Sequence, residues 1–364
     1  MDIFELLRVA KSEGASDLHL VVASPALIRV NGKLESVNGT EPLSAAEVSE
    51  AFIQVTTPEE RDDFHKHLEL DFGYTISGVG HFRCNAAQQR GAISLAVRLL
   101  PPTIPTIDEL ELPQICKRLA VKHRGLIIVS GPTGSGKSTT LAAMIHHLNV
   151  NENRHVVTLE DPIEYVYPNI KCAITQRQLG SDTLSFPKAL KHILRQDPDV
   201  ILVGEMRDQD TAAAVLQVAE TGHLVLSTGH APSAPQAMER IIDLFPPHEH
   251  SLAQARLASL LIAVLCQTLV PRADGSGRIA AVEIMLANSA VRNLIREGKL
   301  YQLANAIRTS HDIGMVSLDE ALVDLYLRKV IDGEILVNYC NDRDEVERLI
   351  GGGGRRTARE VKEV

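Results

Sequence analysis

The sequence predicts an α/β protein with two domains, a small α/β domain at the N-terminus and a larger domain whose last third is helical. Three observations predict this class. At 364 residues the chain is too long for one ordinary core. Two consecutive prolines, Pro101 and Pro102, interrupt the pattern of strands and helices. After them, apolar runs of strand length alternate with helical stretches, which is typical of a mostly parallel sheet.

Composition restricts the class of protein. The chain is 45% apolar and 23% charged, as soluble globular proteins are. Its five cysteines include no C-x-x-C pair, which argues against a zinc module or a disulfide framework and for a reducing compartment. The N-terminus lacks the basic start and the apolar run of a signal peptide, so we expect a cytoplasmic protein. A net charge of −9 and the absence of Trp argue against a general surface for nucleic acid.

The first domain is expected over residues 1–100. The stretch from Ile3 to Ala10 keeps its apolar residues on one helical face. The dipeptide Asn31-Gly32 separates two strand patterns and indicates a hairpin, because it accepts the positive φ of a type I′ turn. The predicted strands are 17–22, 26–30, 33–37, 70–76, 81–87 and 92–99, and further helices are predicted at 45–55 and 58–68.

A linker is expected at residues 101–112, followed by the second domain at 113–350. The apolar stretch Leu257–Val270 is interpreted as a core helix, because it is too short to span a membrane as a helix. Residues 351–364, four glycines and then mostly polar residues, are expected to be disordered. The predicted strands of this domain are 126–129, 155–160, 200–204 and 223–228, and its predicted helices are 139–145, 185–195, 211–220, 235–244, 252–269, 289–297, 300–308 and 318–330.

The octapeptide from Gly131 to Ser138 is the strongest chemical signal, because it matches the full phosphate-loop pattern G-x-x-x-x-G-K-[ST]. An apolar strand precedes it and a helical stretch follows, so that phosphates would lie at a helix N-terminus. Lys137 can reach the β- and γ-phosphates, and the Ser138 hydroxyl is the expected Mg²⁺ ligand. ATP with Mg²⁺ is therefore the expected cofactor, and GTP is disfavoured because no N-K-x-D segment occurs. The predicted nucleotide-binding residues are Gly131, Pro132, Thr133, Gly134, Ser135, Gly136, Lys137, Ser138 and Thr139.

Glu205, at the end of a predicted strand, adds a reaction to nucleotide binding. An acidic residue at the C-terminal end of a sheet strand, beside a phosphate loop, can handle Mg²⁺ or polarise an attacking water. A usual Walker B strand ends in Asp followed by Glu, whereas here Gly204 takes the position of the Asp. Glu205 is therefore interpreted as the catalytic carboxylate, with the metal anchored by other groups. The alternative is a solvated acid at a strand end.

A second acidic segment, Glu160 to Glu164, follows another predicted strand. Three carboxylates in five residues repel one another unless a cation lies among them, and Mg²⁺ bound to ATP is the obvious candidate. The alternative is an acidic turn at the start of a helix.

Two histidines and two arginines could contact phosphates. His223 and His230 bracket a predicted strand, where an imidazole can sense a γ-phosphate, although ordinary packing is the commoner role of a single histidine. Arg83 and Arg98 lie in strand patterns of the first domain. Each could pair with a neighbouring acid, or act as an arginine finger if the two domains close on a nucleotide. The residues alone leave both alternatives open.

Five motifs together resemble the secretion ATPase superfamily, and most closely the PilT-like retraction ATPases of type IV pili. The resemblance extends over nearly the whole chain and is far more specific than a phosphate loop alone. The motifs are Ala15–Leu20 as the early signature, Gly131–Thr140 as Walker A, Thr158–Val166 as the Asp box, Asp197–Asp208 as the atypical Walker B, and Glu220–His230 as the His box.

This resemblance implies a homohexameric ring in which a PAS-like N-terminal domain is joined by a flexible linker to a RecA-like ATPase domain. ATP would bind between the domains, and closure in one subunit after another would do mechanical work. By motif position, the resemblance implies that Lys137 and Ser138 hold the phosphates and Mg²⁺ and that Glu205 acts on the attacking water. It implies that Glu160 and Glu164 support the metal and the water, and that His230 contacts the γ-phosphate. It gives Arg83 and Arg98 phosphate-facing roles.

The partners implied are an inner-membrane pilus platform protein of the PilC-like kind and a possible PilU-like paralogue, with the ring attached peripherally to the inner membrane. No stable nucleic-acid partner is expected. The stretch Ala290–Glu297 resembles the A-I-R-N-L-I-R-E motif of retraction ATPases, with Val in place of one Ile. The chain lacks the long N-terminal region and the four-cysteine module of assembly ATPases.

Three alternatives stay open: an assembly or secretion ATPase, a nucleic-acid translocase, and a non-catalytic ring subunit. Two departures concern the His box. Gly229 stands where the family commonly has Leu, and Pro232 stiffens the following turn.

Overall fold

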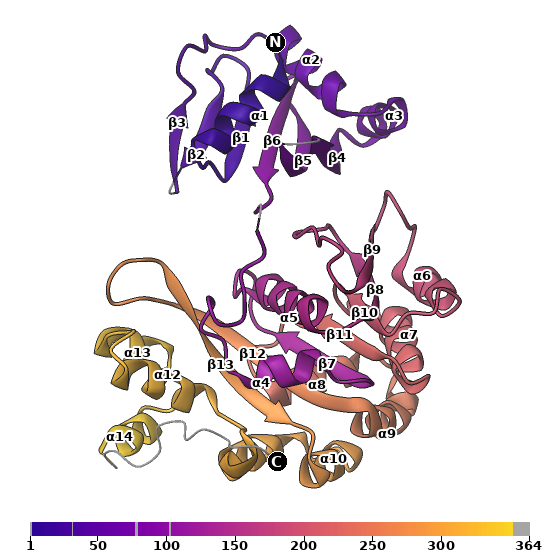
Figure 1. Ribbon diagram of the computed structural model, residues 1–364, viewed down its shortest axis with the longest axis vertical. Helices are drawn as coiled ribbons and strands as arrows, with labels where there is room; N and C mark the ends of the chain where they lie inside the picture. Colours follow the sequence, from indigo (N-terminus) through magenta and orange to yellow (C-terminus); the bar gives the residue numbers. More distant parts are fainter. Residues whose placement is uncertain (1, 31, 77–78, 102, 352–364) are drawn as a thin grey trace. The chain divides into compact units, whose positions relative to one another are not determined.

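The computed structural model describes residues 2–30, 32–76, 79–101 and 103–351, which form two compact units (Figure 1). The first unit extends to Thr103 and includes Pro162–Val166. The second unit comprises Ile104–Asp161 and the chain from Tyr167 onward. It therefore begins within the stretch that the sequence predicts as a linker. In the described part of the chain, no helix is long and apolar enough to cross a membrane.

The first unit is an antiparallel sheet with three helices. Its strand order is β3-β2-β1-β6-β5-β4. Both α2 and α3 begin with a capping box, in which a Ser or Thr side chain and a Glu three residues later bond reciprocally to backbone N–H groups. The elements are α1 (Ile3–Ser12), β1 (Asp17–Leu20), β2 (Leu27–Val30), β3 (Lys33–Ser36), α2 (Ala45–Val55), α3 (Pro58–His67), β4 (Glu69–Ile76), β5 (Gly80–Gln89) and β6 (Ala92–Leu99).

The predictions for this unit are confirmed element by element. The apolar face of α1 is buried in the core. Val30 lies opposite Lys33, so β2 and β3 form the predicted hairpin with a two-residue loop, although Asn31 itself lies outside the described residues. Every second residue of β5 between Phe82 and Ala86 is buried, and the residues between them face away from that core.

A seven-stranded mixed sheet forms the centre of the second unit, in the order β13-β12-β7-β11-β10-β8-β9. All neighbouring pairs are parallel except β12 with β13. The α/β class is therefore confirmed, and the carboxyl ends of β7, β8, β10 and β11 lie at the same edge of the sheet. The strands are β7 (Gly125–Ser130), β8 (His155–Glu160), β9 (Ala173–Gln178), β10 (Val200–Val203), β11 (Leu224–Thr228), β12 (Leu261–Pro271) and β13 (Arg278–Leu286).

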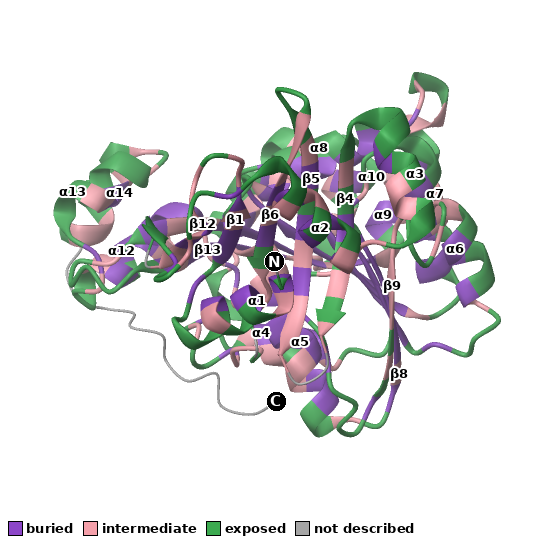
Figure 2. Ribbon diagram, turned by 90° about the horizontal axis from the view of Figure 1, so that it is seen from above, coloured by how far each residue is buried: buried purple, intermediate pink, exposed green. Residues whose placement is uncertain are grey.

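Helices surround this sheet, and their exposed faces turn outward while the strands between them are buried (Figure 2). They are α4 (Ile115–Ala120), α5 (Lys137–Asn151), α6 (Phe186–Ile193), α7 (Gln209–Glu220), α8 (Ala234–Asp243), α9 (His250–Leu260), α10 (Ser289–Arg296), α11 (Leu303–Arg308), α12 (Leu318–Leu327), α13 (Gly333–Tyr339) and α14 (Arg343–Gly351), with 3₁₀ turns η1 (Pro247–Glu249), η2 (Leu300–Gln302) and η3 (His311–Ile313). The last three α-helices gather beside β13 (Figure 1).

The predicted helix 252–269 is wrong in its second half. Helix α9 ends at Leu260, and the apolar run continues as the central strand β12. A mostly apolar run has no period that distinguishes a buried helix from a buried strand. Strand β12 pairs with β7 and β13, and most of its residues are buried, including successive ones that point to opposite faces. The sequence prediction also missed β9, β13, α4, α13 and α14. Of the expected disordered tail, Gly351 is the last residue of α14 and the remainder lies outside the described residues.

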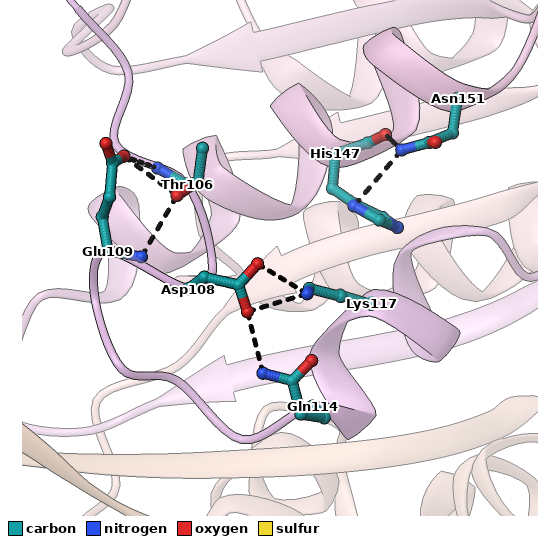
Figure 3. Close-up of polar contacts among 7 residues, drawn as sticks. All are labelled: Thr106, Asp108, Glu109, Gln114, Lys117, His147 and Asn151. Carbon is teal, nitrogen blue, oxygen red and sulfur yellow. Dashed lines mark hydrogen bonds and ion pairs between the residues drawn. The ribbon is translucent and has the colours of Figure 1, made fainter.

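The start of the second unit is fastened by a short polar network (Figure 3). The Glu109 carboxylate accepts from the backbone N–H and the hydroxyl of Thr106, and the Thr106 hydroxyl oxygen accepts from the Glu109 N–H. Asp108 pairs with Lys117 of α4 at 2.6 Å and accepts from Gln114. Between these contacts, Ile107 is buried. These contacts hold residues 106–117 together at the start of the second unit.

Candidate functional site

The phosphate loop connects β7 to α5, as predicted. Residues Gly131 to Gly136 form the loop, and Lys137, Ser138 and Thr139 make the first turn of α5. The helix has no side-chain cap, so the loop presents backbone N–H groups and the positive end of the helix dipole. This is the environment that an anionic phosphate chain requires.

Two side chains of the loop fit a nucleoside triphosphate. The ammonium of Lys137 donates to the carbonyl oxygens of Gly131 and Pro132, at 2.9 and 3.1 Å, and so lies over the loop. The Ser135 hydroxyl is buried and has no hydrogen-bond partner among the described residues. A buried hydroxyl without a partner is costly, and a phosphate oxygen would satisfy it. The loop therefore has both the charge and the donors for phosphates.

Glu205 lies two residues after the end of β10 and is only 9% exposed. Its Oε2 is 2.8 Å from Nε2 of His230, which follows β11. Its other carboxylate oxygen pairs with Nε of Arg207, whose Nη1 is 3.4 Å from a carboxylate oxygen of Asp161 at the end of β8. The fold thus brings the Asp box, the Walker B strand and the His box together, because their three strands are neighbours in the sheet.

Glu160 is the last residue of β8 and is buried, at 8% exposed. Its Oε1 accepts from the Thr158 hydroxyl at 2.6 Å and from the Gln176 amide at 3.1 Å. In the same acidic segment, Asp161 pairs with Arg207 at 3.4 Å. Within the described residues, no group of three or more His, Cys, Asp or Glu could hold a metal. A Mg²⁺ ion here would need phosphate oxygens among its ligands.

Gly204 explains why this Walker B strand lacks its usual Asp. The N–H of Gly204 donates to the Leu159 carbonyl at 2.7 Å, and a Cβ at position 204 would lie 3.3 Å from the same oxygen. A side chain there would press on the backbone of β8. The buried acid beside this point is Glu160, which is therefore the nearest candidate for the role that the Asp usually fills.

The three remaining predicted residues, Glu164, Arg83 and Arg98, belong to the first unit. Arg83 and Arg98 lie directly opposite each other on β5 and β6. The Arg98 side chain donates to Asp17 at 2.9 Å, whereas the Arg83 side chain has no hydrogen bond or ion pair with any residue that the structure describes. Burial alone would raise the pKa of Asp17, but hydrogen bonds from Ser16 and Arg98 hold it below its usual value. Arg98 thus has an acidic partner, whereas Arg83 has none among the described residues.

Sequence reasoning missed Arg207, Thr158 and Gln176. Arg207 follows Glu205 by two residues, which was a readable signal, since a cation next to a strand-end acid is a natural pairing. Thr158 is two residues before Glu160 on the same strand and therefore faces the same way. Gln176 gave no signal, because it lies on β9, a strand that was not predicted.

The His box turn is packed closely against the base of the phosphate loop. The Ser130 hydroxyl donates to the Ala231 carbonyl at 2.7 Å, and the Gly229 N–H donates to Val129 at 3.0 Å. A Cβ at position 229 would lie 3.0 Å from the Ser130 oxygen. Glycine at this departure from the family pattern therefore allows the turn that carries His230 to approach Ser130.

Replacing Gly229 with Ala should lower kcat by about tenfold, because the new methyl displaces either Ser130 or the His230 turn. The steady-state ATPase rate and the melting temperature measure the effect. Gly333→Ala is the matched control, since a Cβ there makes only an ordinary contact of 3.7 Å with Tyr326. Equal rates in the two variants would contradict the claim that position 229 sets the geometry of the turn.

The chain is similar to known proteins both in sequence and in structure. Residues 106–325 match the family model described as Type II/IV secretion system protein. The type IV pilus retraction ATPase PilT of Pseudomonas aeruginosa is 44% identical over 334 residues, covering 92% of this chain and 96% of the relative. The type IV pilus ATPase PilU of the same organism is 40% identical, covering 98% and 94%. A crystal structure of the pilus retraction motor PilT with bound ADP superimposes with a TM-score of 0.89 at 38% identity, covering 96% and 99% of the two chains.

Proposed function

The chain belongs to the Type II/IV secretion system protein family, and from that premise we propose that it is the hexameric ATPase that drives retraction of type IV pili. The observation that carries the proposal is the match to a retraction ATPase over nearly the full length of both chains. The phosphate loop and the contact of Glu205 with His230 supply the parts that hydrolysis needs.

We assign the attacking water to Glu205. Arg207 and His230 each contact one oxygen of the Glu205 carboxylate and so fix its direction. A water that donates a hydrogen bond to this carboxylate would therefore be held in one orientation. His230 is 37% exposed and Glu205 only 11% exposed at the side chain, so the imidazole lies nearer the solvent-accessible edge, where it can meet a γ-phosphate. Positioning of this kind, with stabilisation of the phosphate charge, is most of what a protein contributes to phosphoryl transfer.

Lys137 and Ser138 would hold the phosphates and Mg²⁺, with Glu160 and Glu164 as supporting carboxylates. The chemistry that Mg²⁺ would supply there is positive charge beside the phosphates. Ser138 lies in the first turn of α5, beside Lys137. Glu160 is held by Thr158 and Gln176 through one oxygen, which fixes its direction.

Arg83 and Arg98 are proposed as the phosphate-facing arginines of the first domain. Like charges directly opposite each other on adjacent strands destabilise a sheet unless an anion balances them. Asp17 balances Arg98, and Arg83 is left with no acidic partner in the described chain. A phosphate group would complete the arrangement, and arginine suits it because the planar guanidinium binds two oxygens at once.

The physiological setting is proposed from the same resemblance. The ring would consist of six copies, lie in the cytoplasm against the inner membrane, and act on a PilC-like platform protein. A PilU-like paralogue could share this work. The domain boundaries that fit the proposal are a PAS-like domain at 1–100 and a RecA-like ATPase domain from 113 onward. We expect slow turnover, because domain motion and product release limit many cycles of this kind.

The test is made in cells. With Glu205→Gln at the native locus, pili should be abundant on the surface and should no longer retract, because assembly continues while the retraction motor is blocked. Pilus counts by electron microscopy and retraction by fluorescence imaging of labelled pili measure this. Loss of pili would assign the protein to pilus assembly, and unchanged pili would point to secretion; either result would overturn the proposal.

A further inference from the structure

The turn that carries His230 runs within four residues into helix α8. The side chain of Ser233, the N-cap residue of this helix, makes no hydrogen bond to the helix backbone. Instead, Glu283 of β13 accepts from the N–H of Ala234, the first residue of α8, at 2.6 Å. A carboxylate from a distant strand thus caps the helix, in the role that the N-cap side chain usually has.

Glu283 is buried, at 7% exposed, and burial raises the pKa of its carboxyl above the usual value. The hydrogen bond from the Ala234 N–H acts in the opposite direction and favours the charged form. Loss of this carboxylate would leave the N–H of the buried Ala234 without its acceptor.

A cavity of about 440 Å³ lies beside the capped turn. Its lining includes Pro232, Ser233, Glu283 and Arg308. Three hydrogen bonds hold the turn: Gly229 to Val129, Ser130 to Ala231 and Ala234 to Glu283. The third is the one that joins the turn to β13, on the side where the cavity leaves space next to it.

We propose that Glu283 is a positioning residue for His230. It joins the start of α8 to β13 and so sets where the His box turn lies against Glu205. Glu283 accepts from Ala234, four residues after His230, at 2.6 Å, and His230 meets Glu205 at 2.8 Å. The inference rests on the proposed role of His230 at the γ-phosphate.

A double-mutant cycle tests the inference with the full-length protein. Glu283→Ala should lower kcat by about tenfold and change the KM for ATP by less than about threefold, because the phosphate loop is untouched. In a His230→Ala background the same substitution should have almost no further effect on kcat. An equal loss in both backgrounds would mean that Glu283 does not act through His230, and the inference would then be wrong.

Two further variants keep the result decisive. Asp319→Ala is the matched control. Asp319 lies on α12 and, like Glu283, carries a buried carboxylate, but it accepts from the backbone of Asn341 and Asp342 and not from α8. Its kcat should stay within about twofold of the parent. If Glu283→Ala does not fold, Glu283→Gln should show a smaller loss of about threefold that also vanishes without His230. A parental kcat in Glu283→Gln together with an unfolded Glu283→Ala, or an equal loss in Asp319→Ala, would overturn the inference.

The same data separate this inference from the proposed function. If His230→Ala alone leaves kcat unchanged, the proposed role of His230 fails. If His230→Ala lowers kcat but the Glu283 substitution is additive with it, only the positioning role of Glu283 fails.

Discussion

Replacing Glu205 with Gln should lower kcat for ATP hydrolysis by about 10²- to 10³-fold while ATP still binds. The amide has the shape of the carboxylate but not its charge, so it neither pairs with Arg207 nor orients the water in the same way. Lys137 and the phosphate loop are unchanged, so affinity should stay within a few fold. Phosphate release gives kcat, and titration with a fluorescent ATP analogue gives the affinity.

Glu220→Gln is the control for this substitution. Glu220 also pairs with an arginine, since its two oxygens accept from Arg256 at 2.6 and 2.9 Å, but it lies at the far end of α7. Its loss should cost at most about 1 kcal/mol of stability and leave kcat unchanged, because the pair is partly exposed. A Glu205→Gln protein that hydrolyses ATP at the parental rate would remove Glu205 from the mechanism and favour Glu160 as the carboxylate that acts on water.

Replacing Lys137 with Ala should weaken ATP binding by about 10²-fold or more. The ammonium is the only side-chain charge of the octapeptide and lies over the loop carbonyls, where phosphates would be bound. Binding to the native state alone stabilises a protein, by about 2.7 kcal/mol at a hundredfold excess over Kd. ATP should therefore raise the melting temperature of the parent protein and have little effect on Lys137→Ala.

Lys117→Ala is the matched control for this loss of an ammonium. Lys117 is not part of the octapeptide and pairs with Asp108 at 2.6 Å in the network at the start of the second unit (Figure 3). Its melting temperature should still rise with ATP by the parental amount. An ATP-dependent rise of the same size in Lys137→Ala would show that the nucleotide binds elsewhere.

Some of the site could be predicted because its signals are local. The phosphate loop places its glycines, lysine and serine in eight consecutive residues, between a strand and a helix that the pattern itself predicts. Glu205 and Glu160 could be found because each ends an apolar strand, and parallel strands bring their carboxyl ends to one edge of a sheet. The second half of the helix predicted at 252–269 was wrong because strand β12 is mostly apolar and shows no alternation of apolar and polar residues that would reveal a strand.

The sequence by itself determined the α/β class, the phosphate loop and the acidic residues at strand ends. Only the tertiary structure decided which of these groups touch. The contact of His230 with Glu205, the pairing of Arg207 with Asp161, and the bond from Ala234 to Glu283 join residues separated by 25 to 49 positions. Such contacts follow from strand order, which is a property of the whole sheet and not of any local stretch.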